Sequence, residues 1–293
     1  MNCNICPRNC NVDRSEKMGY CKVTDKIKVS RAALHYWEEP CVSGENGSGT
    51  VFFSGCNMGC VYCQNKNISH DAFGKEITLN RLADIFIELE KKKAHNINLV
   101  TPTHYTPQII NAVKLARNMG LKIPVIYNTS GYEKPENIEM LKETVDVYLP
   151  DFKYISPNLA QKYSFCKDYP QAAKLAIDKM VKQTGPCVFD DEGIIKKGVI
   201  VRVLVLPGYI DEAKQIIKYL YDTYKDDIYI SIMSQYTPCT ELKNYPEINR
   251  KITKEEYDEV VDFAIDIGVE NGFIQQGEAA DESFIPPFDL SGV

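Results

Sequence analysis

The cysteines constrain this chain more than any other feature of its sequence. Eleven of the 293 residues are cysteines, and seven of them fall in two tight groups within the first 63 residues. One group has the spacing Cys-x2-Cys-x3-Cys-x10-Cys, and the other has the spacing Cys-x3-Cys-x2-Cys. An odd number of cysteines in such dense groups is typical of metal sites rather than of a disulfide framework.

The group with three members consists of Cys56, Cys60 and Cys63. It directly follows a predicted strand, and Gly55 and Gly59 let so short a loop wrap its thiolates around one site. A 4Fe–4S cluster held by three cysteines leaves one iron open to another ligand. The alternative is a zinc site that takes its fourth ligand from Cys41 or His70.

The group with four members consists of Cys3, Cys6, Cys10 and Cys21. Four thiolates can close a metal site completely, and we expect either zinc or a second iron–sulfur cluster there. The sequence does not decide between these metals. The scattered cysteines are expected to be small buried hydrophobic residues: Cys41, Cys166, Cys187 and Cys239.

From about residue 50 onward, short apolar runs alternate with amphipathic stretches. The candidate strands span residues 50–54, 97–101, 125–129, 145–149, 199–206 and 228–233. Helical patterns lie between them, with Thr78 as one N-cap candidate and Thr253 with Glu256 as a capping box. This alternation predicts an α/β fold with a parallel sheet or barrel.

The composition of the chain changes along its length and predicts three parts. Residues 1–45 are rich in loops and form a small cysteine-rich metal-binding module, residues 46–275 form the core, and residues 276–293 form a C-terminal tail. Trp37, the sole tryptophan, is predicted to pack the module onto the core.

Charge and hydropathy exclude several classes of protein. The net charge of −6 argues against broad binding to nucleic acids or anionic membranes. No apolar run approaches the roughly 18 residues that a membrane span needs. The first residues lack the basic and apolar regions of a signal peptide, so we expect a cytoplasmic protein.

The spacing from Cys56 to Cys63, with the aromatic Tyr62 before the last cysteine, resembles the radical S-adenosylmethionine (radical SAM) superfamily. The resemblance covers most of residues 46–275, is closest to the pyruvate formate-lyase activating enzyme-like branch of the PflX type, and implies a partial (β/α)6 TIM-like barrel. It also implies a 4Fe–4S cluster that reductively cleaves S-adenosylmethionine to a 5′-deoxyadenosyl radical for hydrogen abstraction. The electron would come from a donor such as flavodoxin or ferredoxin.

Further matches to the family pattern imply that the cofactor is bound by Tyr62, Thr101, Thr103, His104, Asn128, Thr129, Ser130, Asp151, Lys153, Arg202, Gln235 and Tyr236. Asp151 and Lys153 match an Asp-x-Lys motif that holds the methionyl or ribose part. Arg202 matches an arginine that faces the cofactor carboxylate. A lone arginine within an apolar strand needs a buried anionic partner or a place at the barrel lumen or mouth.

One stretch departs from the family pattern. The family usually has Gly-Gly-Glu at the end of the second strand, and residues 98–104 here read Asn-Leu-Val-Thr-Pro-Thr-His. Contacts to the amino group of the cofactor must then come from Thr101 to His104 or from elsewhere. His104 is either a substrate-facing acid or base or a packed, hydrogen-bonded histidine.

Three functions follow from these patterns. The first is activation of a glycyl radical enzyme, in which a glycine loop of that partner gives up a hydrogen atom. The second is radical modification of a small molecule or another protein, which the missing Gly-Gly-Glu and the added cysteines favour. The third is a non-catalytic Fe–S or zinc protein that regulates a partner, and it predicts no cleavage of S-adenosylmethionine.

Overall fold

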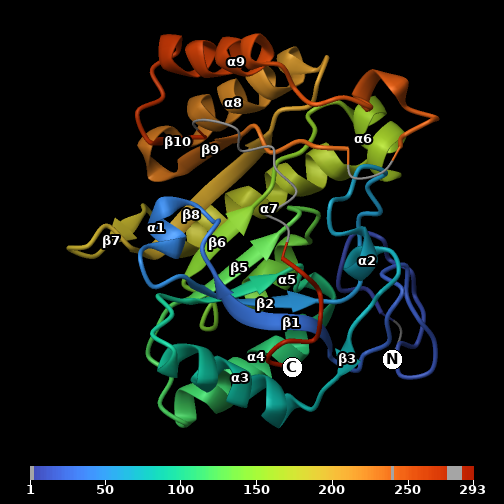
Figure 1. Cartoon of the computed structure of the whole chain (residues 1–293), viewed down its shortest axis with the longest axis vertical. Coiled ribbons are helices and arrows are strands. Elements are labelled where there is room, and N and C mark those ends of the chain that lie inside the picture. The colour runs from blue at the N-terminus through green and yellow to red at the C-terminus, as the bar shows by residue number, and fades with distance from the viewer. Residues whose placement is uncertain (1–2, 239–240, 276–285) are drawn as a thin grey trace.

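The computed structural model describes residues 3–238, 241–275 and 286–293. Its centre is one sheet in the order β10-β9-β8-β6-β5-β4-β2-β1-β3, with β7 paired to β8 (Figure 1). The parallel strands are β2 (Ser48–Phe53), β4 (Ile97–Val100), β5 (Val125–Thr129), β6 (Val147–Pro150), β8 (Ile195–Leu204), β9 (Tyr229–Met233) and β10 (Gly272–Ile274). The chain thus has a mixed α/β fold with a mostly parallel sheet.

Antiparallel strands extend this sheet beyond its parallel part. β1 (Lys28–His35) pairs with β2, β3 (Lys75–Glu76) pairs with β1, and β7 (Val188–Phe189) pairs with β8. All six predicted strands are present within a few residues of their predicted bounds. β1 and β10 were not predicted, and β1 lies in a stretch that was expected to be loop.

Helices connect the successive parallel strands and lie along the sheet. Their bounds are α1 (Pro40–Ser43), α2 (Lys66–Ser69), α3 (Leu79–Lys91), α4 (Thr106–Asn118), α5 (Pro135–Met140), α6 (Pro157–Ser164), α7 (Tyr169–Thr184), α8 (Ile210–Tyr224) and α9 (Lys254–Asp266). Thr78 caps α3 by accepting a hydrogen bond from the Arg81 amide, and Thr253 with Glu256 forms the predicted capping box of α9. None of the described helices is long and apolar enough to cross a membrane.

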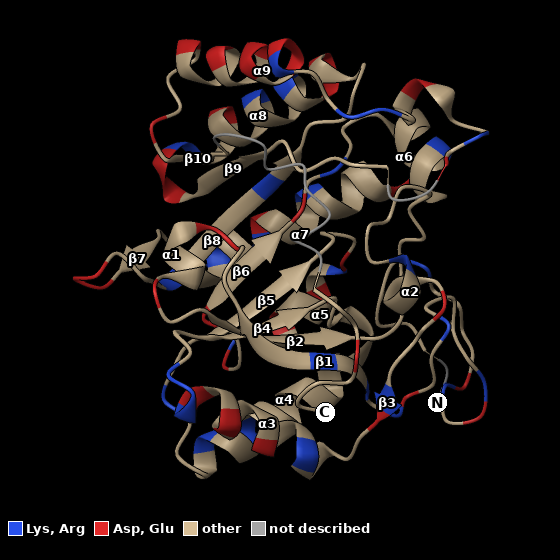
Figure 2. Ribbon diagram, in the orientation of Figure 1, with Lys and Arg blue, Asp and Glu red and all other residues tan. Residues whose placement is uncertain are grey.

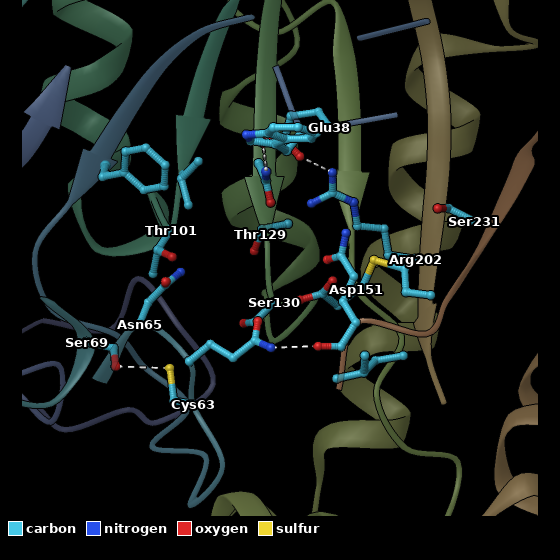
Figure 3. Close-up of a pocket in the computed structure, with 18 of the residues that line it drawn as sticks. Glu38, Cys63, Asn65, Ser69, Thr101, Thr129, Ser130, Asp151, Arg202 and Ser231 are labelled. Atoms are coloured by element: carbon cyan, nitrogen blue, oxygen red, sulfur yellow. Dashed lines mark hydrogen bonds and ion pairs between the residues drawn. The ribbon is translucent and has the colours of Figure 1, made fainter. Parts of the chain in front are cut away.

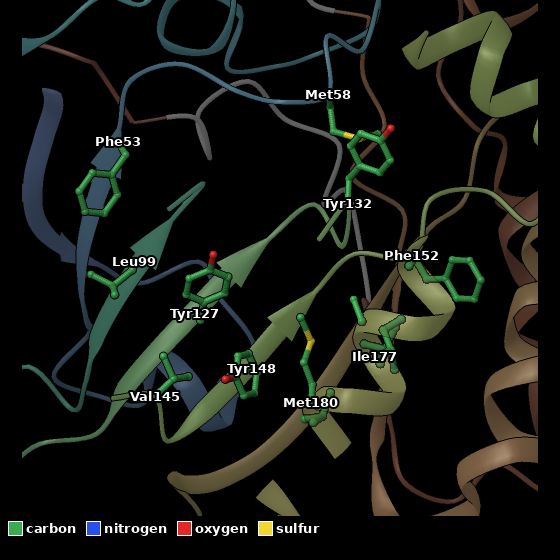
Figure 4. Close-up of a cluster of buried hydrophobic side chains, with 14 of the residues drawn as sticks. Phe53, Met58, Leu99, Tyr127, Tyr132, Val145, Tyr148, Phe152, Ile177 and Met180 are labelled. Carbon is green, nitrogen blue, oxygen red and sulfur yellow. The ribbon is translucent and has the colours of Figure 1, made fainter. Parts of the chain in front are cut away.

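The core lies between the sheet and these helices. Leu99, Tyr127 and Tyr148 come from neighbouring strands and belong to one fully buried cluster with Met180 of α7 (Figure 4). Lys, Arg, Asp and Glu gather instead on outer helices such as α3, α8 and α9 (Figure 2). Strands that are covered on both faces leave few places for charged groups, so a charged residue inside a strand needs an explanation.

The C-terminal segment of the chain lies along β1. The Ala32 amide donates to the Ser291 carbonyl at 2.8 Å, and the Leu290 amide donates to the Ser30 carbonyl at 3.0 Å. Arg31 forms an ion pair with Asp289 at 2.8 Å. The division into parts at residues 45 and 275 stays a prediction. The packing role expected of Trp37 is wrong, because this side chain is 56% exposed and lines a cavity.

Candidate active site

A cavity of about 740 Å³ opens where the parallel strands end. Residues at or just beyond the carboxyl ends of β4, β5 and β6 form one wall, including Thr101, Asn128 and Asp151. Arg202 of β8, the strand next to β6, continues this wall beside Asp151 and lies within its strand rather than after it. Polar side chains at this edge of a parallel sheet are in the position where α/β barrels carry their active sites.

The three cysteines of the Cys-x3-Cys-x2-Cys loop all line this cavity. Each sulfur has a hydrogen-bond partner: Cys56 accepts from the Met58 amide at 3.4 Å, Cys60 accepts from the Ser164 hydroxyl at 3.0 Å, and Cys63 lies 3.2 Å from the Ser69 hydroxyl. The loop therefore presents three thiols to one space, and each thiol is held by a local contact.

These thiols fit an iron–sulfur cluster. Burial raises the pKa of the Cys56 thiol to about 12 and that of Cys60 to about 11. A thiolate here therefore needs a cation beside it, and bound iron supplies that positive charge while it displaces the proton. Thiolate sulfur is the ligand that such clusters use. Three sulfur ligands that face an open cavity therefore provide what a 4Fe–4S cluster with one free iron requires.

A buried ion pair lies beside the cysteines. Lys153 contacts Asp151 at 2.7 Å, and both residues line the cavity. Burial alone would lower the pKa of Lys153, but Asp151 and the thiolate of Cys60 outweigh burial and raise it. Lys153 is therefore a fixed positive charge next to the sulfur ligands.

Arg202 is held by two carboxylates that the sequence did not predict as site residues. Its Nε and Nη2 donate to the two carboxylate oxygens of Glu39 at 2.9 and 2.7 Å, and Nη2 also pairs with Glu38. Glu38 also accepts from the Asn98 amide at 2.8 Å and from the Asn128 amide at 3.5 Å. The anionic partner that a buried arginine needs thus comes from this chain itself.

The cavity has two chemically different ends. In Figure 3, Cys63 lies at one end and Glu38 at the other, with Thr129, Ser130 and Asp151 between them. Trp37 and Tyr36 line the cavity as well, and both side chains are more than half exposed. The thiols and Lys153 therefore occupy one end, and carboxylates with aromatic rings occupy the other.

Most of the residues expected to bind the cofactor surround this cavity. Those that line it are Tyr62, Thr101, Asn128, Thr129, Ser130, Asp151, Lys153, Arg202, Gln235 and Tyr236. Thr103 and His104 are not brought to it. Thr103 donates to Glu133 at 2.6 Å, and His104 Nε2 lies 2.8 Å from the Ser54 carbonyl, so both point into the core. His104 has the surroundings of a packed, hydrogen-bonded histidine.

Thr101 has an unusual backbone conformation. Its φ is +58°, in the left-handed region that glycine adopts readily and β-branched residues avoid. Thr101 lies in the stretch that lacks the Gly-Gly-Glu of the family pattern, and its backbone has a glycine-like conformation. Buried Glu133 holds the following turn by accepting from Thr103 and, at 2.7 Å, from Thr129.

The N-terminal cysteines lie outside the cavity lining. Cys6 and Cys21 are buried, while Cys3 and Cys10 are partly exposed. Among the described residues, no three His, Cys, Asp or Glu side chains converge closely enough to hold a single metal ion. A metal at these four cysteines therefore stays a prediction. Of the scattered cysteines, Cys41 and Cys166 are buried as expected, Cys187 is only partly buried, and Cys239 is outside the described residues.

Two carboxylates and two serines at this site were missed by the sequence analysis: Glu38, Glu39, Ser69 and Ser164. The adjacent glutamates carried a usable signal, because the buried Arg202 required an anionic partner. The serines carried none, because hydroxyl residues are common on surfaces and only the folded chain shows that these two contact sulfur.

Comparison with known proteins adds family evidence to this geometry. The family model described as Radical SAM superfamily matches residues 50–220. An uncharacterized protein of Methanocaldococcus jannaschii, MJ0674, is 31% identical over 270 residues, which cover 90% of this chain and 74% of that protein. Pyruvate formate-lyase-activating enzyme of Clostridium pasteurianum is 29% identical over 119 residues, which cover 39% of this chain and 49% of that enzyme.

Solved structures with the same fold include two of SuiB from Streptococcus suis. SuiB bound to S-adenosylmethionine has a TM-score of 0.52 at 13% identity and covers 76% of this chain. SuiB bound to the precursor peptide SuiA has a TM-score of 0.51 at 13% identity and also covers 76%. The chain spans about half the length of these structures, at 48% and 47%. At this identity the likeness supports the fold alone.

Proposed function

Because the chain belongs to the radical SAM superfamily, we propose that Cys56, Cys60 and Cys63 hold the cluster at which it makes a 5′-deoxyadenosyl radical. When bound, the cluster and S-adenosylmethionine supply a one-electron reductive cleavage that yields this radical and methionine. The observation that carries the proposal is that three hydrogen-bonded thiols of one short loop line a single cavity at the strand ends. The chain is then an enzyme that abstracts hydrogen from a substrate.

The other cavity residues would bind different parts of S-adenosylmethionine. Lys153 and Asp151, next to the thiols, would fix the polar methionyl or ribose part of S-adenosylmethionine. Gln235 and Tyr236 would contact its adenine. Arg202 would offer the remaining donors of its guanidinium to a carboxylate, with Glu38 and Glu39 fixing its orientation.

We propose glycyl radical activation as the first candidate for the overall reaction. The similarity to a pyruvate formate-lyase-activating enzyme over 119 residues supports it. The cavity opens at the strand ends, where a glycine loop of a partner protein would enter. Radical modification of a small molecule or of another protein is the second candidate, and the exposed Tyr36 and Trp37 beside Glu38 favour it.

We also propose that Cys3, Cys6, Cys10 and Cys21 bind a second metal group. The observation that supports this is their dense spacing, together with the direct packing of this segment on the catalytic loop. The Cys21 carbonyl lies so close to Gly55 that a Cβ at Gly55 would come within 2.4 Å of it. Iron counting separates the two metals. About four irons per chain indicates zinc in this group, and about eight indicates a second cluster.

Substitution of one cysteine tests the central claim. Cys60→Ala is expected to lose the visible absorption of the cluster and the formation of 5′-deoxyadenosine after anaerobic reconstitution and reduction. Cys166→Ala is the matched control, because Cys166 is also buried and lies 3.9 Å from Met58 of the same loop without lining the cavity. Formation of 5′-deoxyadenosine by Cys60→Ala would contradict the proposal. Iron binding without any product in the native protein would favour the regulatory alternative.

A second experiment separates the candidate reactions. The reduced protein is mixed with S-adenosylmethionine and a glycyl radical enzyme, and the organic radical is sought by electron paramagnetic resonance. A glycyl doublet supports activation. 5′-Deoxyadenosine without a doublet, from every such enzyme tried, would favour the second candidate.

A further inference from the structure

We propose that Arg8 is a positioning residue that sets the reduction potential of the catalytic cluster, although it lies among the N-terminal cysteines. The proposal rests on the cluster assigned above to Cys56, Cys60 and Cys63. Arg8 contacts none of these sulfurs. It acts through Met58 and Ser164, the two residues that donate hydrogen bonds to Cys56 and Cys60.

Arg8 binds four backbone carbonyls from two distant segments. Its Nε donates to the Asn57 carbonyl at 2.8 Å, and Nη2 donates to the Met58 carbonyl at 2.6 Å, both in the cysteine loop. Nη1 donates to the Phe165 carbonyl at 2.6 Å, and Nη2 donates to the Ser164 carbonyl at 3.1 Å, both at the end of α6. One guanidinium thus joins the catalytic loop to a helix that follows β6.

Two of these carbonyls belong to residues that contact the cluster ligands. The Met58 amide donates to Cys56 Sγ at 3.4 Å, and the Ser164 hydroxyl donates to Cys60 Sγ at 3.0 Å. Arg8 therefore fixes the backbone of Met58 and Ser164, the residues that donate to Cys56 and Cys60. The third donor differs, because Cys63 is paired with Ser69, which Arg8 does not touch.

The site suits arginine for physical reasons. The last carbonyls of α6 have no partner within the helix and carry its partial negative charge, so a cation with several donors stabilises them. Arginine offers five N–H groups in a rigid plane, whereas lysine offers three from one point. The rings of Tyr20 and Tyr132 lie 3.9 and 5.3 Å from the Arg8 Cζ and restrict the plane further.

Hydrogen bonds to cysteine sulfur are one of the factors that set the potential of an iron–sulfur cluster. They stabilise the reduced cluster more than the oxidised one, because reduction adds negative charge that the donors then face. Loss of Arg8 frees Met58 and Ser164 to move, which weakens both bonds. We therefore expect the potential to become more negative.

A double-mutant cycle tests the route of this effect. Arg8→Met and Ser164→Ala are each expected to shift the midpoint potential downward, and their combination is expected to shift it by less than the sum. Arg8→Met combined with Ser69→Ala is expected to be additive, because Ser69 serves Cys63 independently of Arg8. The potentials are read from redox titrations followed by electron paramagnetic resonance.

Lys134→Met is the control for a general loosening of the N-terminal segment. Lys134 ties that segment to the core through the Asn4 carbonyl and, at 2.5 Å, the Asn9 side chain, and neither contact involves the catalytic loop. This variant is expected to keep the native potential. A downward shift as large as that of Arg8→Met would overturn the proposal.

Two other results would also overturn it. One is an unchanged potential in Arg8→Met, and the other is an additive combination of Arg8→Met with Ser164→Ala. If Arg8→Met does not retain its cluster, Arg8→Lys takes its place in the cycle, with a smaller downward shift expected and the same criteria applied. Failure of the proposed function is distinct, since a native protein that binds the cluster but forms no 5′-deoxyadenosine still allows every potential to be measured.

Discussion

Arg202 of β8 and Glu39 in the loop after β1 form a two-point ion pair, with hydrogen bonds of 2.9 and 2.7 Å. The two residues are 163 positions apart in the sequence and both side chains are buried. Glu38 adds a second carboxylate to the same guanidinium. Burial of two anions is favourable only while this cation is present.

Removal of the cation should therefore be costly. Arg202→Met is expected to lower the free energy of unfolding of the cluster-free protein by about 3–5 kcal/mol, because it leaves two buried carboxylates uncompensated. Urea unfolding monitored by circular dichroism measures this. The same substitution combined with Glu38→Gln and Glu39→Gln is expected to recover most of the loss. No recovery would show that lost packing, rather than charge, destabilises the variant.

The strained backbone at Thr101 predicts a substitution that raises the free energy of unfolding instead of lowering it. A left-handed conformation costs an L-residue about 1–2 kcal/mol, and glycine gives back part of this through its greater freedom when unfolded. Thr101→Gly is expected to raise the free energy of unfolding by about 0.5–1 kcal/mol. Thr101→Ala is the control, since it shortens the side chain and keeps the strain. Equal stability of the two variants would contradict this account.

Gly55 connects the catalytic loop to the N-terminal segment and cannot carry a side chain. Its φ is +87°, and a Cβ would come within 2.4 Å of the Cys21 carbonyl. Gly55→Ala is expected to lower the free energy of unfolding by about 3 kcal/mol, since the overpacking cost adds to the conformational cost. Gly120→Ala separates these costs, because Gly120 also has positive φ but no atom within 4 Å of a Cβ.

The comparison that decides this prediction is the difference between the two alanine variants. Gly120→Ala is expected to lose only the conformational part, about 1–2 kcal/mol. Thermal or urea unfolding of both proteins gives the difference directly. If both variants lose the same amount, the contact between Gly55 and Cys21 does not matter for stability.

The strands and the cysteine loop could be predicted because their signals are local. Apolar runs and strand–helix alternation identified β2, β4, β5, β6, β8 and β9. β10 has only three residues. β1 lies in the cysteine-rich N-terminal part and pairs with β2, which comes later in the chain. Strands that depend on pairing rather than on their own pattern leave little trace in a single sequence.

The residues that line the cavity could be predicted only in part, for a similar reason. The residues at strand ends follow from the topology, since all parallel strands end at one edge. Thr103 and His104 are close to Thr101 in sequence, but a short 3₁₀ turn over Thr103–Tyr105 directs them into the core. Glu38 and Glu39 reach the cavity through a loop after β1, a strand that the sequence did not indicate.

The burial of His104 leads to the last prediction, which concerns pH. Burial, with the nearby charge of Arg14, lowers the pKa of His104 from 6.5 to about 3. Between these values the unfolded chain binds a proton at this residue and the folded protein does not. Stability should therefore rise with pH across this window, by up to about 1.4 kcal/mol per pH unit, and this contribution should level off above about pH 6.5.

His104→Gln removes the titrating group and keeps a donor for the Ser54 carbonyl. The free energy of unfolding of the cluster-free protein is measured in urea from about pH 4.5 to 7.5, the range in which the unfolded histidine changes its charge. The variant is expected to show a shallower rise than the native protein over this range, and the two slopes should agree at the alkaline end. Identical slopes at acidic pH would mean that His104 accepts a proton in the folded state, which would require it to lie in a far more polar environment than the core that surrounds it here.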